Sequence, residues 1–107
     1  MKWKCYELDS VDSTNEYAKR LAGEIPDEAL IVAYEQTAGK GRRGRAWESP
    51  KGANIYMSFL LHPTLRADQA SVLTLVMALA VARAVREQTG LDAKIKWPND
   101  IVIGGRK

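Results

Sequence analysis

The chain has 107 residues, 46% of them hydrophobic and 27% charged, which suits one small globular domain and excludes a disordered chain. The formal net charge is only +3, but four of the cations fall within residues 40–45, so the excess positive charge is local. One cysteine excludes an intrachain disulfide framework and fits a reducing cytoplasm, and Cys5 lies in a strand-like segment where we expect a buried thiol. The longest apolar run, residues 75–82, is too short to span a bilayer, so we expect no membrane association.

The first third of the chain predicts two strands around a capped helix. Residues 3–8 read as a strand, and residues 29–34 as a short buried strand. Between them, Ser13 and Glu16 have the spacing of a capping box, and Gly23 follows the apolar stripe as a stop signal.

The middle of the chain predicts a loop, a strand and a long helix. Residues 36–52 are rich in glycine and cations and lack periodicity, so we expect a loop. Residues 53–61 predict a strong strand. Residues 67–89 predict a helix that ends at Gly90 and is apolar on most of its circumference, so we expect it to be largely buried.

The last segment predicts a broken extended run. Residues 94–97 form a short strand, the sequence Pro-Asn-Asp at 98–100 breaks it, and residues 101–103 resume it. The pair Gly104-Gly105 is a hairpin-turn signal. A hairpin needs a partner strand, yet the sequence ends at Lys107, so we expect the chain to stop inside a domain.

Residues 39–45, Gly-Lys-Gly-Arg-Arg-Gly-Arg, are the first candidate for chemistry. Glycines let the backbone approach a ligand, and arginine offers forked donors suited to phosphate or carboxylate. The string lacks the ending of a P-loop. A solvated loop or a nonspecific nucleic-acid contact is an equally good interpretation from composition alone.

Two further groups of residues are candidates. Residues 96–100, Lys-Trp-Pro-Asn-Asp, present a lysine, an amide and a carboxylate where a strand ends; the alternative is a core tryptophan followed by an Asx turn. Residues 13–15, Ser-Thr-Asn, can hydrogen-bond a neutral ligand or simply cap the helix, and the two roles can coexist. Trp47 is either a pocket wall or a core aromatic. A lone His62 makes a metal site improbable, and we predict none.

Taken in chain order, these strings resemble the biotin protein ligase family. The resemblance is carried by residues 12–15, 35–45, Trp47, Ser49-Pro50, residues 52–54, residues 96–100 and Arg106-Lys107. One departure is Lys40, where the family usually has arginine, so that the charge is kept and a forked contact is lost.

The resemblance implies an α+β fold with a mixed β-sheet and helices packed against it, of the biotin/lipoate ligase type related to class II synthetases. Residues 1–107 would then be a truncated, amino-terminal part of the catalytic domain. We expect neither a preceding helix-turn-helix domain nor the following small β-barrel domain. An isolated fragment of this kind would be weakly active or inactive, and would associate through an exposed sheet edge.

The resemblance also implies roles for individual residues. The biotin-binding residues would be Ser13, Thr14, Asn15, Gln36, Lys40, Gly41, Arg42 and Lys107. The residues near ATP and its phosphates would be Arg42, Arg45, Lys96, Asn99 and Asp100. Arg42 and Lys107 would be the catalytic cations, with Lys107 at the biotin carboxylate.

The implied reaction is ATP-dependent activation of biotin to biotinyl-5'-AMP, followed by transfer to a lysine of the biotin carboxyl carrier protein of acetyl-CoA carboxylase. Biotin, ATP and Mg²⁺ would be the small molecules required. Cations suit this chemistry because a carboxylate must attack a phosphate, and the two anions repel each other. We expect a cytoplasmic enzyme that binds no DNA and can form a homodimer.

Two other functions stay open. A lipoate-attaching ligase has the same broad fold, although residues 36–45 favour biotin. A basic nucleic-acid-binding module would explain the arginines, but the charge is local and neither an aromatic platform nor a recognition helix accompanies it.

Overall fold

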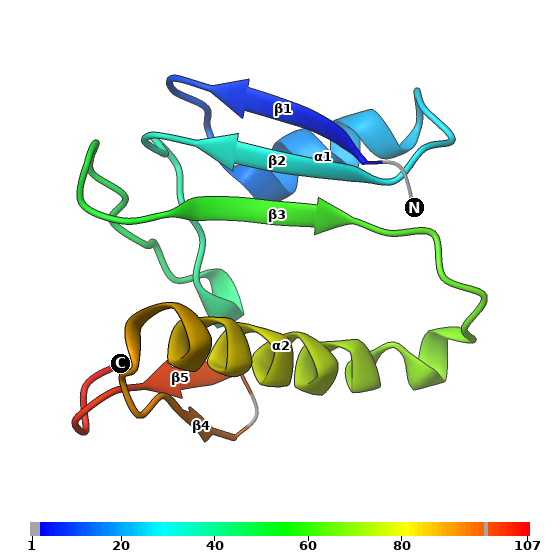
Figure 1. Cartoon of the computed structure of the whole chain (residues 1–107). Coiled ribbons are helices and arrows are strands. Elements are labelled where there is room, and N and C mark those ends of the chain that lie inside the picture. Colours follow the sequence, from blue (N-terminus) through cyan, green and yellow to red (C-terminus); the bar gives the residue numbers. More distant parts are fainter. Residues whose placement is uncertain (1–2, 98) are drawn as a thin grey trace. The chain divides into compact units, whose positions relative to one another are not determined.

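The computed structural model describes residues 3–97 and 99–107 and divides into two compact units, Met1–Pro63 and Thr64–Lys107 (Figure 1). The first unit has a mixed sheet with a helix packed on it, and the second combines a helix with a strand pair. The predicted α+β class is therefore confirmed. The predicted break at Pro98 lies outside the described residues.

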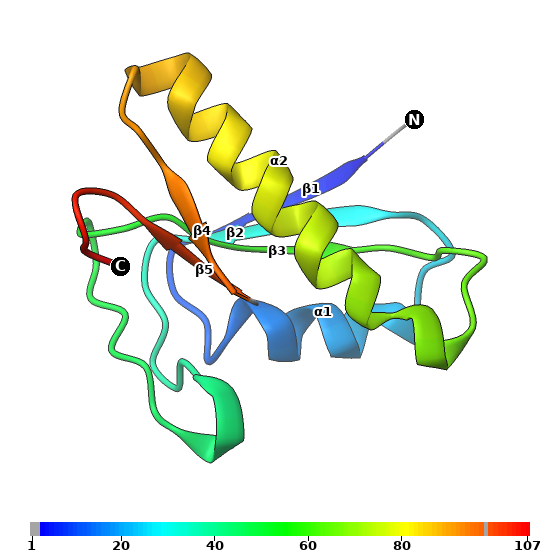
Figure 2. The ribbon, with the colours of Figure 1, turned by 90° about the horizontal axis from the view of Figure 1, so that it is seen from below.

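A three-stranded sheet forms the first unit, in the order β1 (Lys4–Leu8), β2 (Ala29–Ala33) and β3 (Tyr56–Leu60). β1 runs parallel to β2, and β3 runs antiparallel to it. The parallel pair needs a crossover, which α1 (Thr14–Ala22) supplies against one face of the sheet (Figures 1 and 2).

The core of the first unit lies between this sheet face and α1. β2 alternates between buried and half-buried positions, and Ile31 at its centre is fully buried. Ala18 and Leu21 of α1 pack against it. In β3 the inward positions are Tyr56 and Ser58, so a hydroxyl enters a layer that is otherwise apolar.

The start and stop predicted for α1 are confirmed. The Ser13 side chain accepts a hydrogen bond from the backbone N–H of Glu16 at 3.3 Å, which satisfies one orphan donor of the first turn. The helix ends at Ala22, and Gly23 is the C-cap.

The prediction of a buried thiol at Cys5 is wrong, because Cys5 is exposed. Side chains alternate between the two faces of a strand, and in β1 the neighbouring Tyr6 and Leu8 take the core face. Cys5 therefore points to the opposite face of the sheet.

The cation-rich segment predicted as a loop contains local structure. Isolated bridges join Gln36 to Ser49 and Lys40 to Ala46, so the chain doubles back on itself as a narrow hairpin. A short 3-10 turn, η1 (Arg42–Gly44), forms its tip. The following strand starts at Tyr56, three residues later than predicted, because a turn precedes it.

The second unit contains η2 (Ala67–Gln69), α2 (Ser71–Thr89) and two short strands. β4 (Lys94–Lys96) pairs antiparallel with β5 (Asp100–Val102). The predicted helix stop is confirmed, since Gly90 takes the left-handed conformation, at φ 73°, that favours glycine at this position.

The prediction that α2 is largely buried is wrong for the structure as described. Only Ala78 and Ala82 of this helix are buried, while Val72, Val76 and Leu79 are about half exposed. The physical reason is size, because two strands of three residues each cover only one stripe of a 19-residue helix.

By length and composition alone, the segment Ala67–Thr89 is apolar enough to cross a membrane. The core helix of a soluble protein meets the same two criteria, so this finding is weak evidence for a membrane span.

The hairpin turn predicted near the end of the chain is confirmed. Gly104 and Gly105 have φ values of 59° and 78°, the pair of positive angles that a two-residue type I′ turn requires. Ile103 and Arg106 close the turn with reciprocal backbone hydrogen bonds of 2.7 and 3.0 Å.

Candidate functional site

Two segments far apart in the sequence lie side by side in the first unit. The backbone N–H of Thr37 donates to the carbonyl of Val11 at 2.9 Å, and that of Ala38 donates to the carbonyl of Asp12 at 2.8 Å. These bonds hold the entry to α1 against the segment that follows β2. As a result, Thr14 comes next to Gln36.

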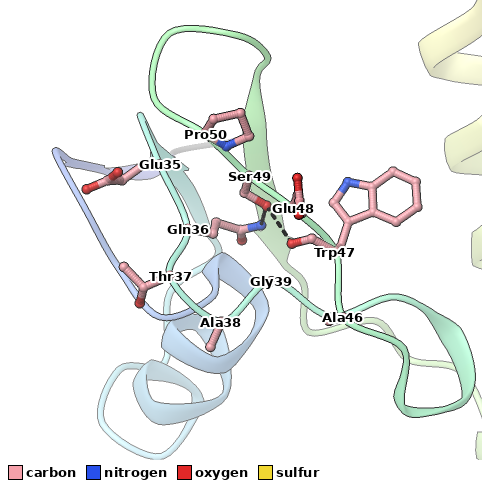
Figure 3. A pocket seen from close by; sticks show the side chains of 10 residues that line it. All are labelled: Glu35, Gln36, Thr37, Ala38, Gly39, Ala46, Trp47, Glu48, Ser49 and Pro50. Carbon is pink, nitrogen blue, oxygen red and sulfur yellow. Dashed lines mark hydrogen bonds between the residues drawn. The ribbon is translucent and has the colours of Figure 1, made fainter.

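The side-chain amide of Gln36 has a fixed orientation. Its Oε1 accepts from the backbone N–H of Thr14 at 2.8 Å and lies 3.2 Å from the Thr14 hydroxyl oxygen. Its Nε2 donates to Ser49 Oγ at 3.0 Å, and Ser49 in turn donates to the carbonyl of Trp47 at 3.2 Å (Figure 3). Because a backbone N–H can only donate, the Thr14 bond determines which end of the amide carries the oxygen.

A second layer of hydroxyls lies behind this amide. Thr14 Oγ1 is 2.8 Å from Ser58 Oγ, and Ser58 also donates to Asn15 Oδ1. All the buried polar residues among those described belong to this part of the chain: Ser13, Thr14, Ser49 and Ser58. Burying a polar group is costly unless it is hydrogen-bonded, and no buried side-chain polar atom of the described residues lacks a partner.

Gln36 and Ser49 line an open pocket of about 400 Å³. The pocket is walled by residues 35–39 on one side and 46–50 on the other (Figure 3). Trp47 is one of these residues and is half exposed, so the interpretation as a pocket wall is confirmed and that as a core aromatic is wrong.

Gly39 makes the narrow base of this hairpin possible. A Cβ at this position would lie 2.5 Å from the Trp47 carbonyl oxygen and 2.7 Å from Ser49 Oγ. Both distances are shorter than van der Waals contact. The Trp47 N–H donates to the Gly39 carbonyl at 2.8 Å, so the close approach is part of the hairpin's own hydrogen bonding.

The tip of the hairpin carries the cations. The Gly41 N–H donates to the Arg45 carbonyl at 2.6 Å, which closes the turn around Arg42–Gly44. Arg43 has φ 60° and ψ 38°, a left-handed conformation that costs energy for any residue with a Cβ. Arg42, Arg43 and Arg45 are all exposed.

Lys40 of the hairpin is paired with α1. Its Nζ lies 2.9 Å from Glu16 Oε1, and Lys19 contacts the same oxygen at 3.3 Å. These two ammonium groups, with Lys40 the larger influence, hold the pKa of Glu16 below its ordinary value. Lys40 was expected to contact biotin, and in this structure its ammonium group is held by Glu16.

A charged clamp supports the segment before α1. Both guanidinium NH₂ groups of Arg20 contact the Asp12 carboxylate, at 2.9 and 3.0 Å, and the Ser13 N–H donates to it at 2.8 Å. Because the Arg20 hydrogen bonds favour the ionised form, they lower the pKa of Asp12 to about 2. The clamp keeps Ser13 and Thr14 in position over the first turn of the helix.

The second unit brings three further predicted residues together. Lys96 is the strand partner of Asp100, and Lys107 Nζ lies 3.6 Å from Asp100 Oδ1. Asn99 is exposed and precedes Asp100 in the chain. Trp97 is 73% exposed, so the alternative in which it belongs to the core is wrong.

The structure therefore places the predicted residues in two groups. The first unit holds Ser13, Thr14, Asn15, Gln36, Lys40, Gly41, Arg42 and Arg45. The second holds Lys96, Asn99, Asp100 and Lys107. Sequence reasoning quoted Ser49 only as part of the family resemblance and missed Ser58. The available signal for Ser58 was its position two residues after Tyr56, on the same face of a predicted strand.

The fit of a divalent cation can be judged from the acidic residues. Among residues 3–97 and 99–107, no three His, Cys, Asp or Glu side chains come close enough to hold a metal ion. Mg²⁺ is often held by one or two carboxylates together with substrate phosphates and water. Asp100 fits such a partial role, and the described residues provide no complete metal cage.

Comparison with known proteins finds close relatives. The chain is 42% identical over 100 residues to the Bifunctional ligase/repressor BirA of Bacillus subtilis, covering 92% of this chain and 31% of that protein. It is 42% identical over 102 residues to the Biotin--[acetyl-CoA-carboxylase] ligase of Paracoccus denitrificans, covering 94% and 42%. The chain thus spans less than half the length of these two relatives.

Solved structures agree in fold. The biotin protein ligase of Leishmania major in complex with biotinyl-5-AMP matches with a TM-score of 0.82 and 34% identity, over 95% of this chain and 48% of that one. The Aquifex aeolicus ligase in complex with biotin and ATP matches with a TM-score of 0.76 and 38% identity, over 92% and 40%. Residues 7–107 match the model of the biotin/lipoate A/B protein ligase family. The chain belongs to that family.

Proposed function

We propose that the protein carrying this chain activates biotin with ATP to biotinyl-5'-AMP and transfers the biotinyl group to a lysine of a carrier protein. The names of the matched ligases and the ligands in their complexes support this assignment. The observation that carries it is the fixed amide of Gln36 in the pocket wall.

That amide has the hydrogen-bonding capacity that a ureido ring needs. Gln36 uses one Nε2 hydrogen on Ser49, so a second N–H is left to donate to a carbonyl. Its Oε1 is oriented by Thr14 and can also accept from a ligand N–H. The ureido ring of biotin offers one carbonyl and two N–H groups, whereas the dithiolane ring of lipoate offers neither, so the site favours biotin over lipoate.

The cations serve the first chemical step. The carboxylate of biotin attacks the α-phosphate of ATP, a bond forms between carboxylate oxygen and phosphorus, and pyrophosphate leaves. Arg42 at the hairpin tip and Lys107 in the second unit would offset the negative charge that accumulates on the reacting groups. In this proposal Arg45, Lys96 and Asn99 contact the phosphates of ATP.

The hairpin serves the second step by excluding water. Biotinyl-5'-AMP is a mixed anhydride that water hydrolyses, so a glycine-rich hairpin over the pocket extends its lifetime. The ε-amine of the carrier lysine then attacks the acyl carbon, an amide bond forms, and AMP leaves. No side chain of the described residues stands out as a general base for this amine.

Mg²⁺ would supply charge neutralisation on the phosphates when bound. Asp100 could contribute one oxygen ligand, and the phosphates and water would provide the others. Asp100 also lies 3.6 Å from the Lys107 ammonium group, so the lysine is near the residues of its own unit that we propose for phosphate binding.

The partner that we propose is the biotin carboxyl carrier protein of acetyl-CoA carboxylase, in the cytoplasm. The name of the Paracoccus denitrificans relative supports this choice. A homodimer is a further proposal, supported by β1 and β3, which are the edge strands of the three-stranded sheet in the described residues.

Exchange of labelled pyrophosphate into ATP tests the function directly. The protein expressed from its complete gene should catalyse exchange with biotin present, and neither without biotin nor with lipoate in its place. Exchange with lipoate alone would assign the protein to lipoate attachment, and no exchange by a folded protein would refute the proposal. Arg42→Ala should release the adenylate faster than the unchanged protein.

A further inference from the structure

Ser58 occupies an unusual place for a polar side chain. It stands at the centre of β3, opposite Ile31 in the register, and is only 8% exposed. Its hydroxyl hydrogen-bonds to two residues of the α1 entry, Thr14 and Asn15, and neither of these lines the pocket. Ser58 is therefore placed to act through its neighbours.

The hydrogens of this cluster can be counted. Asn15 Oδ1 carries no hydrogen, so the single hydrogen of the Ser58 hydroxyl goes to it. Ser58 must then accept across its 2.8 Å contact with Thr14, which makes Thr14 the donor. Thr14 has one hydroxyl hydrogen, and its contact with Ser58 is shorter than its 3.2 Å contact with Gln36.

This count fixes what the site offers to a ligand. With its hydrogen committed to Ser58, the Thr14 hydroxyl does not donate to Gln36 Oε1. Gln36 Oε1 keeps the backbone N–H of Thr14 as its donor and has acceptor capacity left. Because Gln36 lines the pocket, this free acceptor capacity of Oε1 favours a ligand ring that carries N–H groups.

We propose that Ser58, held by Asn15, is a specificity-determining positioning residue that takes the Thr14 hydroxyl hydrogen away from Gln36 Oε1 and so lets this oxygen select a ureido ligand. This inference rests on the proposed function, since it names the part of biotin that the network distinguishes. If Ser58 were absent, Thr14 would give its hydrogen to Gln36 Oε1, and one acceptor of the site would be lost.

The alternative is that Ser58 only fills space in the sheet. A purely structural role would weaken binding whether or not Thr14 has a hydroxyl. A role exerted through Thr14 disappears once that hydroxyl is removed, and this difference can be measured as a coupling between two substitutions.

The test is calorimetry of biotin and lipoate binding to the protein expressed from its complete gene. Ser58→Ala should weaken biotin binding about fivefold to tenfold, the effect of one hydrogen bond. In a Thr14→Val background the same substitution should change biotin affinity by less than about twofold, because additivity fails for residues in contact. Ser58→Thr, which restores the hydroxyl, should recover most of the affinity, and the exposed Ser10→Ala should bind as the unchanged protein does.

Asn15→Ala provides a second route if Ser58→Ala fails to fold. It removes the acceptor of the Ser58 hydrogen from the exposed surface of α1, and should weaken biotin binding only when Thr14 is present. The inference is overturned if the substitutions weaken biotin binding equally with Thr14 and with Val at position 14. It is also overturned if neither Ser58→Ala nor Asn15→Ala weakens binding. In both cases biotin binding by the unchanged protein would still support the proposed function. Absence of biotin binding by the unchanged protein would instead remove the proposed function, and the inference with it.

Discussion

The hydroxyl and amide network of the first unit differs from the charged group Lys96, Asp100 and Lys107 of the second. In the first unit neutral hydroxyls and an amide are buried and hydrogen-bonded to one another, with Thr14 only 4% exposed. In the second unit the polar groups are charged and more accessible, and Lys107 contacts Asp100 loosely at 3.6 Å. Short neutral hydrogen bonds need fixed geometry, whereas charges act over longer distances and tolerate adjustment.

This difference suggests a division of labour within the proposed reaction. A network of hydroxyls can recognise the shape and hydrogen-bond pattern of a neutral ring, because each bond has a direction. Exposed charged side chains can adjust their positions and stabilise negative charge as it shifts from the carboxylate to the phosphate and the leaving group. We therefore expect substitutions in the hydroxyl network of the first unit to change binding and stability, and substitution of Lys107 in the second unit to change rate.

The largest effect that we predict is on rate. Lys107→Ala should lower biotin-dependent pyrophosphate exchange about 100-fold, the usual loss when one stabilising group for transition-state charge is removed. Biotin affinity without ATP should change far less. Lys94→Ala is the matched control, since Lys94 lies in the same unit and pairs with Asp92 at 3.7 Å. Equal losses in both variants would show that the general positive charge matters and the position of Lys107 does not.

The next prediction concerns stability in the first unit. Gly39→Ala should destabilise the protein by about 1–3 kcal/mol, because its Cβ would overlap the Trp47 carbonyl and Ser49 Oγ and force the hairpin apart. Biotin binding should weaken together with the unfolding free energy measured in urea. Gly23→Ala is the control: no atom lies within 4 Å of its Cβ position, and we expect no loss of stability there. If Gly39→Ala left the free energy of unfolding unchanged, the base of the hairpin would have to be wider than in this structure.

Several elements of both units, and the region of the candidate site, could be predicted from the sequence. The Ser13 cap and the Gly104-Gly105 turn are local patterns, because the groups that they bring together are three or fewer residues apart. The resemblance carried by the strings at 12–15 and 35–45 points to the right region of the first unit. Local spacing and family strings therefore identify elements and the neighbourhood of the site.

What could not be predicted depends on contacts between distant residues. Ser58 meets Thr14 across 44 positions, and Lys40 meets Glu16 across 24. The segment around Ser58 is apolar on both faces, so alternation alone does not say which face is buried. The exposure of Cys5 and of α2 was mispredicted for a related reason, since burial depends on which other elements cover a face.

A smaller effect is expected at the hairpin tip. Arg43→Gly should stabilise the protein by about 0.5–1 kcal/mol, because glycine adopts the left-handed conformation that Arg43 holds at φ 60° without steric cost. Arg45→Gly at φ −70° is the matched control and should be neutral or destabilising. Thermal unfolding measures both variants. A loss of stability in Arg43→Gly would indicate that the arginine side chain makes contacts worth more than the strain.

The smallest effect tests whether a charged pair supports the neutral network. Arg20 lowers the pKa of Asp12 from its ordinary value of 3.8 to about 2, so ionised Asp12 is favoured by folding. The resulting stability is complete above the ordinary pKa and is lost as the pH falls from about 4 through about 2. In Arg20→Gln the pKa of Asp12, followed by NMR titration, should rise toward 3.8, and acid unfolding should begin at higher pH. Because the Asp12–Arg20 pair is partly exposed, added salt should also raise the pKa of Asp12 and the pH of acid unfolding in the unchanged protein. An unchanged Asp12 titration in Arg20→Gln would show that backbone N–H groups, that of Ser13 first among them, and not Arg20, hold the pKa of this carboxyl down.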